Sequence, residues 1–552
     1  MNRSSANKVL ASMRKELRRS IKDLKAPSYP RPYYISYLFK ETETFNVWAR
    51  YGSIVAHKKD RQRHCYADVR VGSYAFDHVS QGGLHDNKEE DESAELCEMP
   101  LEDGEDGLRF ALWRLTDSRY REAVSSYFSK KSRQVSYLDE NKGIRSWQKM
   151  PVSKEYKTLR KADFSEESMT KLVKKLSLVL KDFPDIKSSY CDFSAELVSK
   201  VYVNSEGSEK WWQIPHYNLT IYAWYHSPKV NQDFTLTFQS QDLREIPSFL
   251  SLKKQILKKI DFLYSLENAD KMRSYSGPVL LAPQPAGLLI HEVLGHRLEG
   301  VRLLSDREGK TFQGRIGDRI THTDLSIYDD PTMKTFGENT LSGYYPFDDE
   351  GSPAERADLI EKGVLKGFLT TRSPITKKIG ATNGHARTAS FERPVSRMAN
   401  LIVESHSKHS WDDLKSLLVA ELKKRHLPYG IILLEVEGGE TETDSYDFQA
   451  FMGQVTEAVK IYANGKEKLV RGVDFVGTPL NSLANIIAVG SSYEVDNSYC
   501  GAESGTIPVS TVAPALLLSD LELQLKSPNA VTQYVLPLPW MKTKSRKPSR
   551  KK

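Results

Sequence analysis

The sequence of 552 residues is long enough for two or three domains, and with 39% hydrophobic and 27% charged residues it has the composition of a globular protein. The formal net charge of +7 does not indicate a nucleic-acid-binding protein, because the tail from Lys542 to Lys552 holds seven basic residues and no acid, which leaves the rest of the chain close to neutral. We interpret residues 529–552 as a disordered basic tail, with contact to nucleic acid or anionic lipid as the alternative.

The first 29 residues are predicted to form a basic amphipathic helix, because Leu10, Met13, Leu17, Ile21 and Leu24 recur at intervals of three and four. Such a helix lies on a membrane surface, or it docks on the body of the protein or on a second subunit. The segment lacks the apolar core of a signal peptide, and no apolar run in the chain reaches the ~18 residues that span a bilayer.

Residues 30–270 are predicted to form an N-terminal α/β domain of sheets with flanking helices. We expect strands over 66–74, 211–225 and 233–239, and helices over 108–128, 171–181 and 246–266. Between the first strand and the first helix, residues 86–106 hold eleven acidic side chains, which predicts a mobile, solvated loop. A gate over an active site is the alternative for this acidic loop.

Residues 271–528 are predicted to form a strand-rich C-terminal domain with few long helices, which makes the fold class α+β. We expect strands over 277–282, 430–437, 458–463, 486–489 and 507–518. After the first of these strands, Pro283-Gln284-Pro285 predicts a turn that opens a helix, and apolar residues follow as far as Ile290.

That helix leads into His291-Glu292-Val293-Leu294-Gly295-His296, a His-Glu-x-x-x-His pattern in a chain with only 13 histidines. In a zinc-binding His-Glu-x-x-His helix, two histidines four residues apart hold the metal and the Glu activates water. Five residues turn a regular helix by about 500°, so His291 and His296 would point roughly 140° apart. We therefore predict a π-helical turn that realigns them, with two unrelated helix histidines as the alternative.

A catalytic zinc site uses three protein ligands, so a third is needed. The four cysteines form no C-x-x-C pair and no regular disulfide framework, which suits a reducing compartment, and we expect a cytoplasmic protein: Cys65, Cys97, Cys191 and Cys500. Cys500 is expected in a polar turn before Gly501, where its sulfur would be accessible to a metal; an inert buried thiol is the alternative.

Other chemistries have less support in the sequence. There is no G-x-G-x-x-G, no P-loop and no G-x-S-x-G elbow. Asp329-Asp330 and Asp348-Asp349-Glu350 would suit Mg²⁺ or Ca²⁺, but adjacent acids more often mark turns. His385 follows Asn383-Gly384, a turn signal, and is either an exposed loop histidine or a residue that handles substrate or protons near a metal.

At these residues the chain resembles the TldD/PmbA metallopeptidases. The pattern His291-Glu292-x-x-x-His296-x-x-Glu299-Gly300 is similar to the family's zinc-binding helix, and Tyr499-Cys500-Gly501 falls where the family carries a Cys ligand. Further similar segments lie along most of the chain: Arg31–Tyr37, Asp68–Tyr74, Asp329–Pro331, Phe347–Gly351, Leu359–Leu365, Asn383–Arg387 and Arg397–Asn400. The family's Cys-Gly-Lys-x-Gly-Gln run is not kept, because Ala502 and Gly505 replace its Lys and Gln.

The resemblance implies that His291, His296 and Cys500 bind Zn²⁺ and that Glu292 is the general base of a peptidase that cleaves unfolded or flexible peptides. It also implies dimers, either of this chain alone or with a related subunit. His385, Arg387 and Arg397 are weak candidates for substrate binding. The rival hypotheses are a non-catalytic subunit of the same fold that binds peptides or a partner, and a metal enzyme acting on a non-peptide amide or ester.

Overall fold

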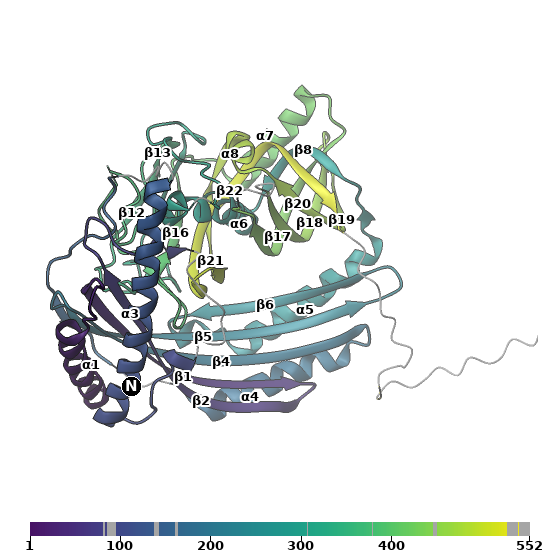
Figure 1. Ribbon diagram of the computed structural model, residues 1–552. Helices are drawn as coiled ribbons and strands as arrows, with labels where there is room; N and C mark the ends of the chain where they lie inside the picture. Colours follow the sequence, from purple (N-terminus) through teal and green to yellow (C-terminus); the bar gives the residue numbers. More distant parts are fainter. Residues whose placement is uncertain are drawn as a thin grey trace, which may run out of the picture.

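The computed structural model describes the chain except for residues 81–82, 85–94, 137–142, 160–163, 306, 378, 445–449, 527–538 and 540–552. The fold is α+β, as predicted, and consists of two large sheets with helices packed on their faces (Figure 1). The predicted domain boundaries at 29/30, 270/271 and 528/529 remain predictions. Most of the predicted basic tail, and the acidic loop as far as residue 94, lie outside the described residues.

The first sheet has six strands, and β2, β1, β4 and β5 follow one another across it with antiparallel pairing. At the far edge, β3 pairs with one end of β5 and β6 pairs with the other. The strands are β1 (Pro32–Arg50), β2 (Ser53–Val71), β3 (Lys154–Tyr156), β4 (Ile186–Asn204), β5 (Glu209–His226) and β6 (Asn231–Ser240). The three predicted strands are confirmed. Strand β2 begins thirteen residues earlier than expected, and the sequence did not show this because the first half of the strand is exposed and rich in charged residues.

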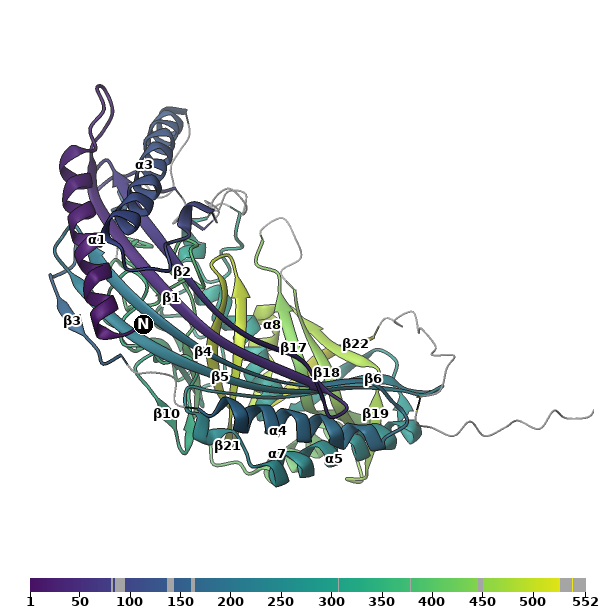
Figure 2. The same cartoon turned by 90° about the horizontal axis from the view of Figure 1, so that it is seen from below.

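Two pairs of helices cover this sheet. Helices α1 (Arg3–Asp23) and α3 (Glu105–Ser136) pack at one end, and α4 (Glu166–Val179) and α5 (Phe249–Ser265) lie side by side along it (Figure 2). The apolar stripe of α1 is buried against the sheet and α3, with Leu10, Met13 and Leu17 in one core cluster. Of the alternatives for this helix, docking on the body of the protein is therefore the one observed.

The C-terminal part of the acidic segment is packed, contrary to the prediction of a solvated loop through residue 106. Cys97 is buried in the core, Glu98 forms a bridge with His64, and Asp103 accepts a hydrogen bond from the buried Arg63 at 2.8 Å. Helix α3 then begins at Glu105 instead of near Leu108. Acidic residues of this segment form ion pairs at the edge of the fold, as Asp103 does with Arg63 and Glu105 with Lys15. A count of acidic residues in the sequence does not reveal these pairs.

The second sheet has twelve strands in the order β13-β12-β9-β16-β22-β8-β17-β18-β19-β7, with β21 paired to β22 and β20 paired to both β18 and β22. Its main strands are β8 (Tyr275–Leu281), β9 (Leu325–Asp329), β12 (Ala357–Glu361), β16 (Asn400–Ser405), β17 (Tyr429–Thr441), β18 (Phe451–Tyr462), β21 (Ile486–Ala502) and β22 (Gly505–Leu525). The shorter strands are β7 (Asp270–Lys271), β13 (Val364–Leu365), β19 (Glu467–Arg471) and β20 (Val473–Gly477), and two small hairpins lie apart from the sheet: β10 (Thr335–Phe336) with β11 (Asn339–Thr340), and β14 (Ala386–Arg387) with β15 (Val395–Ser396).

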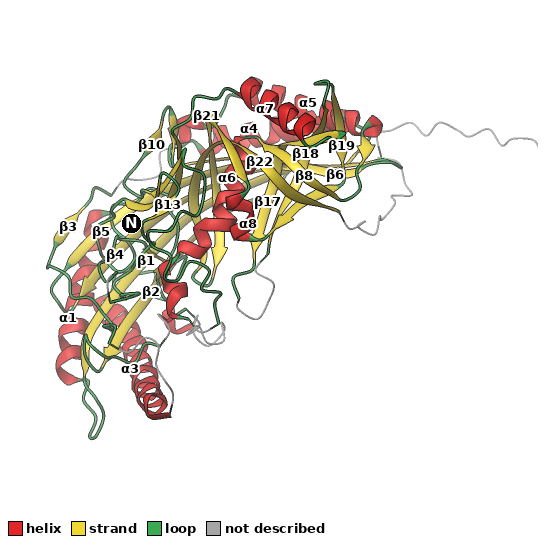
Figure 3. Ribbon diagram, turned by 90° about the horizontal axis from the view of Figure 1, so that it is seen from above, coloured by secondary structure: helices red, strands yellow, loops and turns green. Residues whose placement is uncertain are grey.

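Helices cover both faces of this sheet. In β8, Val279 and Leu281 point into the core that contains α6 (Pro283–Ile290), whereas Leu280 points into the core under α7 (Trp411–Lys424). This alternation explains why the strand reads as a continuous apolar run. Helix α8 (Pro479–Ala484) lies near α6 and β22 (Figure 3). No helix among the described residues is long and apolar enough to cross a membrane.

Candidate metal centre

The helix that carries the histidines changes its hydrogen bonding at the motif. Helix α6 begins with Pro283 at its first position and buries Ala286, Leu289 and Ile290. It continues as a π-helical turn, η5 (His291–Gly295), in which the His296 N–H donates to the His291 carbonyl five residues back. A short 3₁₀ turn, η6 (His296–Leu298), follows. The predicted π-turn is confirmed.

Gly295 leaves room at this turn for the side chain of Met398. A Cβ atom at position 295 would lie 2.1 Å from the Met398 sulfur, far inside van der Waals contact. The close approach packs the turn against the segment that also carries Arg397.

Cys500 lies in a strand and not in the predicted turn. It is the third residue from the end of β21 and pairs with Ile507 of β22, in a tight hairpin that turns through Glu503 and Ser504. The sequence signal was misleading because the polar residues before Cys500 belong to the strand itself.

The hairpin and the helix bring three potential ligands together. The ligand atoms of His291, His296 and Cys500 lie within 4.8 Å of one another, and all three residues are buried. Cys500 Sγ is 3.4 Å from His296 Nε2. Ligands of a tetrahedral zinc, at about 2.0 Å for nitrogen and 2.3 Å for sulfur, stand about 3.6 Å apart, so the spacing fits this ion. Two imidazoles and a thiolate form a donor set that zinc favours, and three ligands leave one position open.

The charges of the site support the same interpretation. Burial opposes ionisation of the Cys500 thiol, but the neighbouring His296 and His291 outweigh it and hold the pKa of Cys500 well below its usual value. Burial likewise opposes protonation of His296, yet Cys500 and Glu299 raise its pKa to about 10. A thiolate is thus favoured next to the imidazoles, and the thiolate is the form that binds a metal.

A buried ionic network holds His296 from behind. Its Nδ1 lies 3.3 Å from Glu299, whose carboxylate also faces Arg302 at 2.9 Å and Arg397 at 3.4 Å. Burial would raise the pKa of Glu299, but the charges of His296 and Arg302 lower it to about 2. A carboxylate on the far nitrogen of a ligating histidine sets its tautomer and orientation, so Glu299 is placed to leave Nε2 for the metal.

Arg302 and Arg397 extend this network to the hairpin. Arg397 donates to the Cys500 carbonyl at 2.7 Å and lies 3.3 Å from its sulfur, while Arg302 pairs with Glu503 at 3.0 Å. Sequence reasoning missed these roles for both arginines and for Glu299, although Glu299 stands three residues after His296, the spacing of neighbours on a helical turn. Glu503 takes part through an ion pair in the run that lacks the family's Lys and Gln.

Glu292 lies between the two histidines and is 6% exposed. Within the described part of the chain, no donor bonds to its carboxylate, whereas its backbone carbonyl accepts a hydrogen bond from Arg297 at 2.8 Å. Burial disfavours the charged form of His291, but Cys500 and the adjacent Glu292 raise the pKa of His291. An unengaged carboxylate there is able to accept a proton.

The other site candidates are buried. His385 is fully buried instead of lying on an exposed loop, because its ring bonds to Asn383 and faces Asp329 at 3.2 Å. Arg387 donates to the Met398 and Pro508 carbonyls. The described residues thus engage His385 and Arg387, whereas Arg397 donates to the Cys500 and Gly505 carbonyls and keeps its Nε, 3.4 Å from Glu299, without a hydrogen bond.

The acidic pairs do not assemble a second metal site. Asp348 accepts from the backbone of Glu350 and Ser352, as a turn residue does, and Asp329 accepts from Ala399 and Asn400. Over the residues that the structure describes, His291, His296 and Cys500 are the only group whose ligand atoms are close enough to share an ion.

Comparisons with known proteins show which proteins the chain is similar to. Residues 274–525 match the model of the PmbA/TldA metallopeptidase C-terminal domain. The chain is 29% identical over 362 residues to a metalloprotease of Archaeoglobus fulgidus, which covers 64% of this chain and 77% of that protein. It is 25% identical over 365 residues, 65% of this chain and 76% of the other, to a zinc metalloprotease TldD homolog of Saccharolobus solfataricus. The chain spans about half, 47%, of the length of each of several further relatives.

The fold is also known. The crystal structure of TldE from Thermococcus kodakarensis superimposes with a TM-score of 0.61 over 93% of this chain and 100% of that one, at 14% sequence identity. At this level of identity the match establishes the shared fold and nothing about the chemistry.

Proposed function

The chain belongs to the TldD/PmbA family, and from that premise we propose that it is a zinc-dependent peptidase. The observation that carries the proposal is the buried cluster of His291, His296 and Cys500 with the Glu292 carboxylate beside it. A subunit that only binds peptides would have no need of a complete ligand set and an adjacent base.

We assign the roles by chemistry. His291, His296 and Cys500 would hold the zinc ion, which when bound supplies Lewis-acid polarisation of the scissile carbonyl and lowers the pKa of water toward about 7. Glu292 accepts a proton as the water oxygen forms a bond to the carbonyl carbon, and then delivers that proton to the amide nitrogen, so that the C–N bond breaks and the amine leaves. Glu299, behind His296, acts as a positioning residue. Buried surroundings exclude bulk water and strengthen these electrostatic effects.

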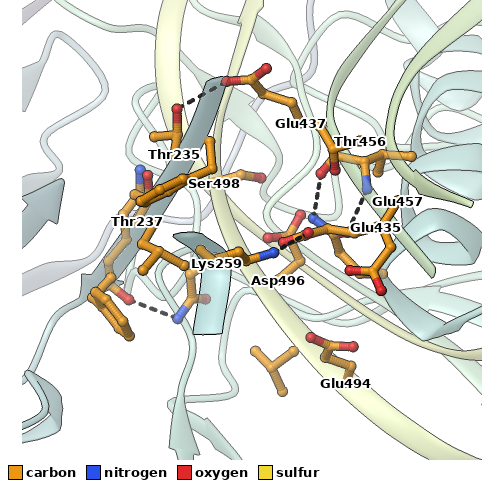
Figure 4. A pocket seen from close by; sticks show the side chains of 18 of the residues that line it. Thr235, Thr237, Lys259, Glu435, Glu437, Thr456, Glu457, Glu494, Asp496 and Ser498 are labelled. Carbon is orange, nitrogen blue, oxygen red and sulfur yellow. Dashed lines mark hydrogen bonds and ion pairs between the residues drawn. The ribbon is translucent and has the colours of Figure 1, made fainter. Parts of the chain in front are cut away.

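The substrate would approach through a large cavity between the two sheets. This cavity of about 1180 Å³ is lined by β6 of the first sheet and by β17 and β21 of the second (Figure 4). Its lining includes Tyr499, next to Cys500, but none of the three candidate ligands. Strand β6 pairs with β5 along one edge only. An extended peptide is able to pair with such an edge by backbone hydrogen bonds, which favours flexible substrates of loose sequence preference.

Assembly and location are part of the same proposal. We infer a dimer, of this chain alone or with a related subunit, from the family resemblance. We infer a cytoplasmic location from the four cysteines, which are all free and buried.

Three substitutions test the assignment of roles. His296→Ala and Cys500→Ser should each purify with far less than stoichiometric zinc, because each removes one of three ligands. Glu292→Gln should keep its zinc and lose activity by two or more orders of magnitude, because it removes only the proton acceptor. Zinc analysis and cleavage of a fluorogenic peptide measure both. Full zinc in both ligand variants would refute the metal site, and wild-type protein without zinc would favour a binding subunit.

A second experiment tests the enclosed site. One small protein is supplied in native and in denatured form, and cleavage of each is followed by electrophoresis. The enzyme should cut the denatured form and spare the native one, since only an extended chain enters the cavity. Equal cleavage of both forms would contradict this.

A further inference from the structure

The cavity that Ser498 and Tyr499, the two residues before Cys500, help to line is strongly acidic. Eight of the residues that line it are Asp or Glu, and only two, Lys258 and Lys259, are basic. Lys259 is already paired with Glu435, and Lys258 is exposed to solvent. The lining therefore has an excess of negative charge in a recess where water screens charges less than it does on an open surface.

Three of these carboxylates form no ion pair or hydrogen bond with another described residue: the half-buried Glu457 on β18, and on β21 the half-buried Asp496 and the exposed Glu494. Figure 4 shows all three at the wall of the cavity. Burial together with nearby carboxylates raises the pKa of Glu494, and burial raises the pKa of Glu457 and Asp496. Lys259 and Lys258 oppose this shift at Glu457 and His291 opposes it at Asp496, but neither carboxylate forms an ion pair, and water compensates the charge of the exposed Glu494.

The acidic side chains of β21 lie on the same face of the strand as Cys500. Side chains two residues apart on a strand share a face, so Glu494, Asp496 and Ser498 form a row that ends at the candidate ligand Cys500. Four residues of strand span about 13 Å. An extended peptide that runs beside β21 with its scissile bond at the metal would thus carry a side chain past Asp496 a few residues from the cleaved bond.

We propose that this row, with Glu457 opposite, selects peptides that carry Lys or Arg within a few residues of the scissile bond. The inference rests on the proposed peptidase function and adds the chemical class of its substrate. A cationic side chain would occupy the cavity and supply the positive charge that Glu494, Asp496 and Glu457 lack. An acidic peptide would meet like charges and be rejected, which is how electrostatic complementarity produces specificity.

The test uses one short flexible peptide in three forms that differ only in carrying Lys, Gln or Glu at the same two positions on one side of the cleaved bond. Two readouts are taken: kcat/KM with the zinc-loaded wild-type protein, and the dissociation constant with the Glu292→Gln variant, which binds without turnover. Both should favour Lys over Glu by about tenfold or more at low salt, and the ratio should fall as the ionic strength rises.

The variants Asp496→Asn, Glu494→Gln and Glu457→Gln should each lower the Lys-to-Glu ratio by about two- to fivefold. The matched control is Glu404→Gln on β16, an exposed carboxylate outside the cavity, which should leave the ratio at its wild-type value. The positions on β21 and β18 belong to different strands, so misfolding or zinc loss in one variant, seen by circular dichroism and metal analysis, leaves the other as the test.

The outcomes separate this inference from the function on which it rests. Cleavage of all three peptides with a Lys-to-Glu ratio near one would overturn the cationic preference and leave the peptidase standing. Absence of cleavage by zinc-loaded protein would overturn the peptidase, and the binding ratio of the Glu292→Gln variant would still decide the preference. A ratio that is unchanged in all three carboxylate variants would overturn the assignment to this cavity.

Discussion

Replacing Glu299 by Gln should weaken zinc binding and destabilise the protein, although Glu299 is no ligand. The carboxylate is 1% exposed and faces three cationic groups, Arg302 at 2.9 Å, His296 Nδ1 at 3.3 Å and Arg397 at 3.4 Å. Gln has nearly the same shape and keeps one oxygen as an acceptor, so the change removes mainly the charge. Two buried guanidinium groups then lose a counter-ion.

Loss of one partner from a buried ion pair costs about 3–5 kcal/mol, and the retained acceptor oxygen places Glu299→Gln near the lower end of that range. Loss of a carboxylate that orients a ligating histidine costs about 10- to 100-fold in metal affinity. Because Glu299 is also one of the groups that raise the pKa of His296 to about 10, the ring should titrate at a lower pH in the metal-free variant.

Zinc affinity is measured by competition with a chromophoric chelator, stability by chemical denaturation, and the titration of His296 by NMR on metal-free protein. Glu503→Gln is the matched control, because Glu503 also pairs with Arg302 but is 27% exposed. It should change zinc affinity by less than about twofold. Wild-type zinc affinity in the Glu299→Gln variant would refute the positioning role.

Two further predictions concern the packing and the titration of buried groups. In the Gly295→Ala variant the new Cβ would fall 2.1 Å from the Met398 sulfur, so the protein should lose about 1–3 kcal/mol of stability and part of its zinc. Adding Met398→Ala to this variant should restore part of both. A double mutant no better than Gly295→Ala would disprove the steric cause. Burial raises the pKa of Glu350 to about 7, above its unfolded value, so its contribution to stability is present below about pH 4.5 and is lost as the pH rises through 7, on the order of 3 kcal/mol. The stability difference between wild type and Glu350→Gln, measured by denaturation at several pH values, should follow this window, and a difference that is constant with pH would contradict it.

The helix that carries His291 and His296 was the most predictable part of the candidate site because its constraint is local. A helix places residues by a fixed rotation, so the five-residue separation of His291 and His296 either excludes a shared ion or requires a π-turn, and the structure contains that turn. The preceding strand β8 and the helix-opening Pro283 are equally local signals, and both are confirmed.

The groups around the helix were less predictable because they come from distant segments. Cys500 and Arg397 lie 204 and 101 residues beyond His296 in the chain. His385 was assigned to an exposed loop because Asn383-Gly384 is a turn signal, yet that turn is packed inside and His385 faces the buried Asp329. Local patterns identify turns, but the burial of a turn depends on what the rest of the chain places over it.

In strand β21, polar residues next to the candidate site hide the apolar pattern by which a strand is predicted. An apolar strand was predicted over 486–489, but β21 extends to Ala502 through Glu494, Asp496 and Ser498, residues that disfavour strands or are neutral to them. Its partner β22 supplies the apolar core, so β21 is held by backbone pairing and is free to present polar side chains to the cavity. The polar residues that make 494–498 resemble a loop in the sequence are therefore the ones that lead to the candidate ligand Cys500. A weak strand pattern next to a candidate ligand is better interpreted as a binding surface than as a break in the sheet.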